Sequence, residues 1–196
     1  MTLGRLTTPD GPHENTAINI SVTDSDTIGS LPTDFQLGMD TEFRYGRVFI
    51  PPVYGPEIDA GDKTEIPFTV EYWADPDGDT VFNFVLNTDD GDTEYTTWDL
   101  EACTDGSVSC GDITINQTVN PSTIVAGRSL RNIDNAITVN RPGAGNAGDV
   151  TVQINVDDWL SFDWDTGTLG DENPGTQINF GLYRGHDRII YWREVQ

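Results

Sequence analysis

Acidic side chains gather in several glycine-containing turns of this sequence, and carboxylates grouped in this way can bind a hard cation. Calcium takes about six to eight oxygen ligands, and alternate positions around a glycine can direct several carboxylates at one ion. Turns also favour aspartate without any ion, so plain solvated turns are the alternative interpretation. The candidate calcium ligands are Asp75, Asp77 and Asp79; Asp89, Asp90 and Asp92; and Asp163, Asp165 and Asp171.

Aromatic residues are concentrated towards the end of the sequence. A row of rings on one strand face can stack against sugars, but it can equally pack a hydrophobic core. An arginine beside such rings can pair with a carboxylate of the chain itself or of an acidic partner. The candidate binding residues are Trp159, Trp164, Tyr183, Arg184, Tyr191 and Trp192.

Residues for catalysis are sparse. The two histidines, His13 and His186, lie in a polar segment and in a turn-like segment, and no serine lies in a nucleophile-elbow motif. Paired carboxylates could hydrolyse glycosides, but among 33 acidic residues their presence is uninformative. We therefore expect no catalytic residue and no enzymatic activity; a secreted hydrolase is the least favoured alternative.

Two cysteines, Cys103 and Cys110, flank a short segment with an Asp-Gly turn signal at residues 105–106. Such a turn could fold the two sulfurs together, and the small closed loop would stabilise the fold by about 2.5 kcal/mol. The spacing is not that of a zinc site, since no second cysteine pair or nearby histidine completes a ligand set. We expect a structural disulfide, with two free thiols as the alternative.

The chain carries 10 basic and 33 acidic residues, a net charge of −23. This sign argues against nucleic acid and anionic membranes as partners, because neither gains counterion release from an anionic protein. No segment approaches the ~20 apolar residues that cross a bilayer, so we expect no membrane insertion. The first residues also lack the pattern of a signal peptide. The chain is then either cytosolic or a piece of a longer secreted protein, and the paired cysteines favour the second.

Hydrophobic residues alternate with polar ones along most of the chain, which predicts half-buried β-strands. The run at residues 81–86 is apolar on both faces and predicts a central strand. With 20 Gly and 11 Pro available for turns, the strands favour an all-β fold, an antiparallel β-sandwich or jelly roll. The clearest alternating segments are residues 18–22, 65–72, 150–156 and 177–182.

The domain organisation has two candidate forms. In the first, residues 1–40 form an N-terminal strand and a polar lead-in, and residues 41–196 form one β-sandwich domain. In the second, the chain splits near residue 120 into two small immunoglobulin-like sandwiches. A single domain is preferred, because all-β domains of this length often stay undivided.

The last third of the sequence carries a resemblance. Residues 159–164 (Trp-Leu-Ser-Phe-Asp-Trp) and 180–194 (Phe-Gly-Leu-Tyr-Arg-Gly-His-Asp-Arg-Ile-Ile-Tyr-Trp-Arg-Glu) resemble the closing segment of MshQ-like proteins of the mannose-sensitive haemagglutinin (MSHA) type IV pilus system. The sequence departs from that pattern at residues 163–170, where an Asp-Gly-Asp-Gly turn is more usual; this departure weakens a calcium site there. Earlier segments agree in order at residues 43–47, 54–55, 71–73, 103–104 and 142–148.

The resemblance implies a large secreted protein of the bacterial cell surface whose C-terminal region has no established activity. The function expected from it is a non-catalytic extracellular module that acts in pilus assembly or adhesion. Its partners would be pilus subunits or other surface proteins. The alternative is a calcium-assisted, glycan-binding adhesin domain.

Overall fold

The computed structural model describes residues 8–14, 17–18, 35–36, 42–91, 97–116, 124–131, 136–157, 160–163 and 172–181. This part of the chain is all β and contains no α-helix, which confirms the predicted fold class. It therefore has no helix long and apolar enough to cross a membrane. The elements are β1 (His13–Glu14), β2 (Ala17–Ile18), β3 (Phe35–Gln36), β4 (Glu42–Phe43), β5 (Gly46–Phe49), β6 (Val53–Gly55), β7 (Lys63–Glu65), β8 (Thr69–Ala74), β9 (Asn83–Leu86), β10 (Trp98–Thr104), a 3-10 turn (Cys110–Asp112), β11 (Ile115–Asn116), β12 (Ile124–Val125), β13 (Arg128–Ser129), β14 (Thr138–Asn140), β15 (Gly148–Ile154) and β16 (Gly175–Phe180).

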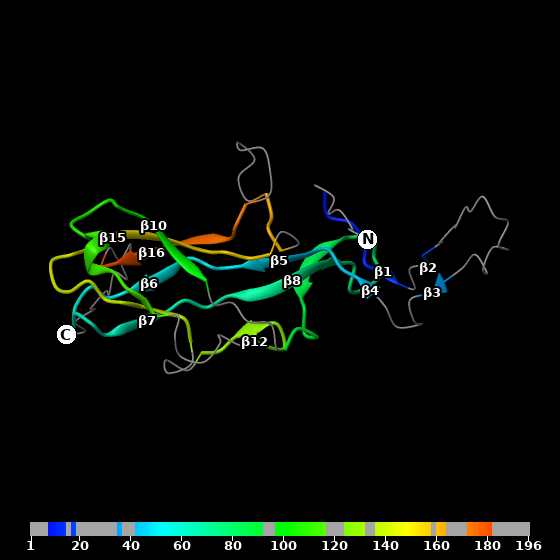
Figure 1. The fold of residues 1–196 in the computed structure, drawn as a ribbon, viewed down its shortest axis with the longest axis horizontal. Helices are drawn as coiled ribbons and strands as arrows, with labels where there is room; N and C mark the ends of the chain where they lie inside the picture. Colours follow the sequence, from blue (N-terminus) through cyan, green and yellow to red (C-terminus); the bar gives the residue numbers. More distant parts are fainter. Residues whose placement is uncertain are drawn as a thin grey trace, which may run out of the picture.

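The strands form the layers of a sandwich, seen lengthwise in Figure 1. One sheet has the order β10-β15-β16-β6, in which only the β16–β6 pair is parallel among the described strands. Facing it are two antiparallel sheets, β11-β14-β7 and β12-β13-β8-β5, with β9 added to β8. Two small pairs, β1–β4 and β2–β3, lie at one end of the molecule.

The core lies between these layers, and the period-two pattern explains why. Successive strand residues point to opposite faces, so every second residue of β15 and β16 enters the core. Val150, Val152 and Ile178 are fully buried there, in one cluster with Val48 and Val70 of the opposite layer. The cluster contains residues from both sides of position 120, while residues 117–123, where the alternative domain split falls, lie outside the described residues.

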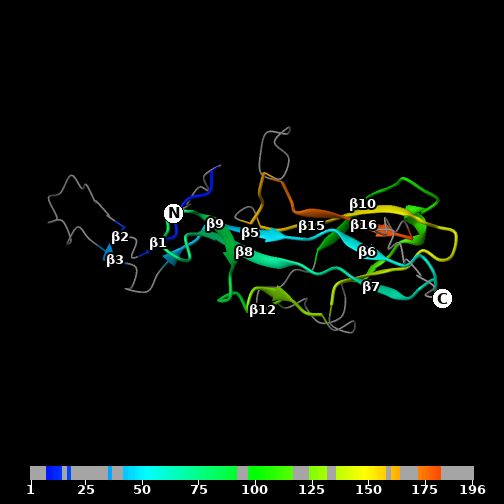
Figure 2. The same ribbon diagram turned by 180° about the vertical axis from the view of Figure 1, so that it is seen from behind.

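A proline pair carries the chain from one layer to the other. β5 pairs with β8, whereas β6, which follows after Pro51 and Pro52, pairs with β16. Proline has no backbone N–H, so it ends ladder pairing and lets the extended chain change sheets. β5 and β6 therefore run on as one line through Figures 1 and 2 while belonging to different sheets.

The alternating segments at residues 150–156 and 177–182 correspond to β15 and β16, shifted by about two residues. Residues 65–72 form two strands, β7 and β8, interrupted around Pro67. The predicted central strand at residues 81–86 is wrong: β9 pairs with β8 alone among the described strands and is half-exposed. Of residues 18–22, only Ile18 is described, at the end of β2.

The predicted disulfide is confirmed. Cys103 of β10 bonds to Cys110 of the 3-10 turn, with their Cα atoms 5.5 Å apart. Between them, the backbone N–H groups of Ser107 and Val108 donate to the Ala147 carbonyl at 2.7 and 3.2 Å. A Cβ atom at Gly106 would collide with that same carbonyl, so glycine is required for this close approach.

Candidate functional site

The first predicted acidic group forms a compact loop directly after β8. Carboxylate oxygens of Asp75, Asp77 and Asp79 lie within 4.8 Å of one another. Asp75 organises the loop, since its Oδ1 accepts from the N–H of Gly78 at 2.9 Å and its Oδ2 from that of Thr80 at 2.8 Å. The carboxylates of the two other aspartates are exposed beside it.

This arrangement suits a divalent cation. Three carboxylates held this close repel one another in water, and a cation such as calcium between them would offset that repulsion. Asp77 and the Oδ2 atom of Asp79 would be the main ligands, because hydrogen bonds already engage both oxygens of Asp75 and the Oδ1 atom of Asp79. The loop is the one such cluster among the residues that the structure describes.

The other two acidic groups are not brought together in this way. Asp89 forms an ion pair with Arg44 at 2.7 Å, and Asp90 accepts the Gly127 N–H at its backbone carbonyl. Asp163 is exposed. The remaining predicted ligands, Asp92, Asp165 and Asp171, lie outside the described residues.

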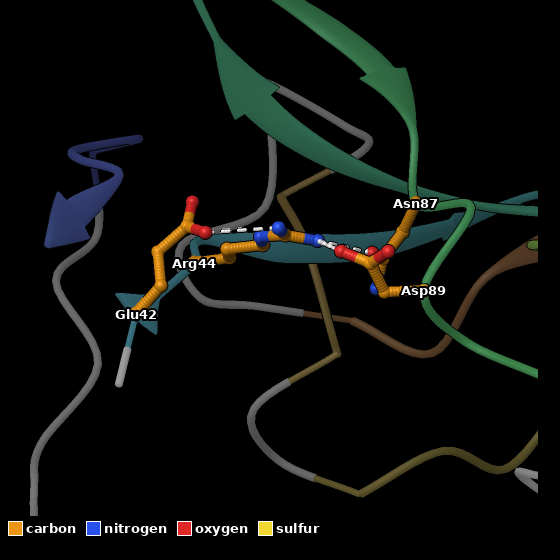
Figure 3. Close-up of polar contacts among 4 residues, drawn as sticks. All are labelled: Glu42, Arg44, Asn87 and Asp89. Carbon is orange, nitrogen blue, oxygen red and sulfur yellow. Dashed lines mark hydrogen bonds and ion pairs between the residues drawn. The ribbon is translucent and has the colours of Figure 1, made fainter. Parts of the chain in front are cut away.

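Arg44 joins three polar side chains at the point where β4 leads into β5 (Figure 3). It donates to Glu42 at 2.9 Å and to Asn87 at 2.6 Å, and it pairs with Asp89. Its guanidinium carbon also lies 4.3 Å from the centre of the Tyr72 ring. The hydrogen bond to Glu42 raises the pKa of Arg44 above its usual value, so the side chain stays cationic wherever the fold can be studied.

Arg47 lies on β5, an edge strand among the described strands, opposite Glu71 of β8. Two of its nitrogens donate to Glu71 Oε2, at 2.9 and 2.8 Å, and its guanidinium carbon lies 3.6 Å from the centre of the Phe84 ring. Phe84 in turn packs edge-on against Trp73 and Phe162, at 5.1 and 5.3 Å between ring centres. Sequence reasoning missed this cluster; the alternation of Arg, Glu and rings on β5, β8 and β9 was the signal that could have found it.

Next to this cluster lies an exposed apolar segment. Val81 and Phe82 are 55% and 41% exposed, and they lead directly into β9. Phe82 stacks on Trp73 with 6.1 Å between ring centres. Residues 81–86 contain no charged side chain, and the outer edge of β9 has no strand partner among the described residues.

The residues of the predicted aromatic binding site lie outside the described residues. They stay predictions: Trp159, Trp164, Tyr183, Arg184, Tyr191 and Trp192.

Comparison with known families places the chain. The family model described as DUF6701, fourth domain, matches residues 44–195. The chain belongs to this family. DUF6701 is a domain of unknown function, so membership assigns no activity and no site residue. No curated protein and no solved structure matches the chain.

The described candidate features all fall within the DUF6701 match. They are the acidic loop after β8, the arginine–aromatic face around Arg47 and the uncharged segment at residues 81–86. The acidic loop and the uncharged segment lie between β8 and β9 or on β9, and the face around Arg47 of β5 adjoins them through Glu71 of β8 and Phe84 of β9. These three features of the DUF6701 domain therefore lie close together in the fold.

Proposed function

We propose that this DUF6701 domain is a non-catalytic extracellular module of a pilus-associated surface protein, acting in pilus assembly or adhesion through protein–protein contacts. The pilus assignment, of the MSHA type IV kind, rests on the resemblance of the closing segment to MshQ-like proteins. The Cys103–Cys110 disulfide is compatible with an extracellular location, since such bonds persist in oxidising compartments.

The observation that carries the proposal is the uncharged edge at residues 81–86. Soluble proteins protect edge strands with charges, bulges or covering segments, because an open edge pairs with other chains. This chain has 33 acidic residues, yet none lies in that segment. An edge left uncharged in so acidic a protein is suited to accept a strand from a partner by β-augmentation.

A binding experiment separates protein partners from glycans. The immobilised domain is presented with purified pilin subunits of an MSHA-type pilus and, in parallel, with a glycan array. The proposal expects saturable binding of a pilin and no glycan signal that depends on Trp192. A glycan signal that Trp192→Ala abolishes, without pilin binding, would contradict it.

A second candidate, a calcium-assisted glycan-binding domain, is favoured by one observation, the convergent carboxylates of Asp75, Asp77 and Asp79. A cation that binds the folded state stabilises it in proportion to the logarithm of its concentration. The melting temperature should then rise in millimolar calcium and fall back with chelator, and Asp77→Asn should abolish the rise. An unchanged melting temperature in the wild type would remove this candidate.

A further inference from the structure

A pocket of about 450 Å³ opens on the side of the sandwich, where β6 of one layer meets β7 of the other. Both strands are sheet edges among the described strands, and Figures 1 and 2 show them at the opposite end of the molecule from β1 and β4. Gly55 makes the approach of the strands possible, because a Cβ atom there would lie 2.8 Å from Thr64 Oγ1. The pocket is large enough for a small-molecule ligand.

The pocket is basic in a strongly acidic protein. Lys63, Arg131 and Arg141 line it, against one acidic lining residue, Glu65. These are three of the ten basic residues of a chain whose net charge is −23, and Lys63 is its sole lysine. Such a local reversal of sign attracts an anionic group that the rest of the surface repels.

Two of the three basic side chains have no ion-pair partner among the described residues. Arg141 pairs with Asp62 at 3.3 Å, but neither Lys63 nor Arg131 forms an ion pair in the part of the chain that the structure describes. Arg44 and Arg47, which are both partly buried, do pair with carboxylates in the described sheets. Within the described part of the chain, Lys63 and Arg131 can therefore both face a ligand in the pocket.

Two donors at the pocket lack acceptors. Thr64 Oγ1 and Arg141 Nε are buried and have no hydrogen-bond partner among the described residues. Both residues line the pocket, but these two atoms are covered from its open space and do not themselves face a ligand.

The pocket wall also has an exposed ring. Tyr54, on β6, is 66% exposed, and Pro52 and Pro56 flank it on the same wall. An exposed ring can pack against the apolar face of a sugar while its hydroxyl hydrogen-bonds a sugar hydroxyl. A peptide strand added to either edge would need a row of alternate pockets, whereas here the cations and the ring meet at one pocket.

We propose that the β6–β7 pocket binds an acidic saccharide, a sugar unit whose carboxylate is held by Lys63 and Arg131 and whose ring packs on Tyr54. The pocket uses none of the residues at 81–86, so it is independent of the pilin contact and adds a second binding activity to the module. It requires no metal ion.

Calorimetric titration with trigalacturonic acid tests this proposal in low-salt buffer containing chelator, which removes any contribution of calcium at the acidic loop. The neutral galactotriose, inorganic phosphate and a hexa-aspartate peptide are the comparison ligands. Wild-type protein should bind the trigalacturonate and none of the three others measurably. Phe82→Lys should leave the binding of trigalacturonate unchanged. A failure of saccharide binding can therefore be distinguished from a failure of pilin binding.

The variants locate the site. Lys63→Gln and Arg131→Gln should each weaken binding by about tenfold, and Tyr54→Ala by a similar factor. Arg128→Gln removes the same charge from an exposed arginine outside the pocket and should change binding by less than about twofold. All four side chains are at least partly exposed, and an unchanged circular dichroism spectrum verifies folding.

Three outcomes would overturn the proposal. They are the absence of trigalacturonate binding by the wild type, an equal loss in Arg128→Gln, and equally tight binding of phosphate or of the hexa-aspartate peptide. The last would mean that the pocket selects charge alone or an acidic peptide.

Discussion

Arg47 stabilises the fold through two kinds of contact, an ion pair with Glu71 and a cation–π contact with Phe84. Both members of the ion pair are 18% exposed, so removing one leaves a poorly hydrated charge. Arg47→Met should lower the free energy of unfolding by about 2–4 kcal/mol, measured by urea denaturation with an unchanged slope. The double variant Arg47→Met/Glu71→Leu should recover part of that loss.

The control for this prediction is Asp89→Asn. Asp89 also pairs with an arginine, but its side chain is 70% exposed, so its removal should cost less than about 1 kcal/mol. If the double variant loses as much free energy of unfolding as Arg47→Met and Glu71→Leu lose together, the ion pair does not contribute to stability.

At this scale, sequence reasoning succeeded where the contact is local. The Cys103–Cys110 bond joins residues close in the chain, so spacing and a turn signal sufficed. The carboxylates of Asp75, Asp77 and Asp79 also lie together, but their binding of a cation stays a prediction. The contacts of Arg47 could not be predicted, because they depend on the register between β5, β8 and β9, which a single sequence does not specify.

Among the elements, the disulfide loop that follows β10 offers a direct test of stability. The bond restricts the unfolded chain, so the double variant Cys103→Ser/Cys110→Ser should lose about 2.5 kcal/mol in the free energy of unfolding. Thermal or urea unfolding of the oxidised wild type, the reduced wild type and this variant measures the effect. Reduced protein and variant should agree; an oxidised protein no more stable than either would contradict the expected role.

The position of β9 shows the limit of prediction for elements. The sequence pattern at residues 81–86 indicates a strand with two apolar faces, and such a pattern by itself predicts a strand buried on both faces. In the structure β9 pairs with β8 alone among the described strands, so it lies at an edge. The rings of Trp73 and Phe162 pack against Phe84 and partly shield one face of the strand. Pairing partners come from tertiary contacts that the pattern does not contain.

For the whole molecule, the net charge of −23 should make stability depend on salt. The screening length is about 30 Å at 0.01 M and about 8 Å at physiological ionic strength, so repulsion between distant acidic loops acts mainly in dilute buffer. We expect the melting temperature to rise by about 2–4 °C or more between these conditions, in sodium chloride with chelator present. An unchanged melting temperature would mean that the charge serves solubility alone.

The fold class also follows from sequence at this scale, because period-two alternation and frequent turn residues leave few alternatives to an all-β sandwich. The path of the chain does not. The chain changes sheet at Pro51 and Pro52. The parallel pairing of β6 with β16 then joins segments more than a hundred residues apart. Sequence alternation assigns each strand a buried face but no neighbour.

One affinity measurement tests whether the module binds a protein partner through the uncharged edge. Dissociation constants of purified MSHA-type pilin subunits are compared for wild type, Phe82→Lys and Val125→Lys at physiological salt. Val125, on β12, is 60% exposed, so its variant adds the same charge on a comparably exposed apolar residue. We predict about tenfold or greater weakening by Phe82→Lys and no change by Val125→Lys. Absence of pilin binding by the wild type, or an equal loss in both variants, would contradict the account.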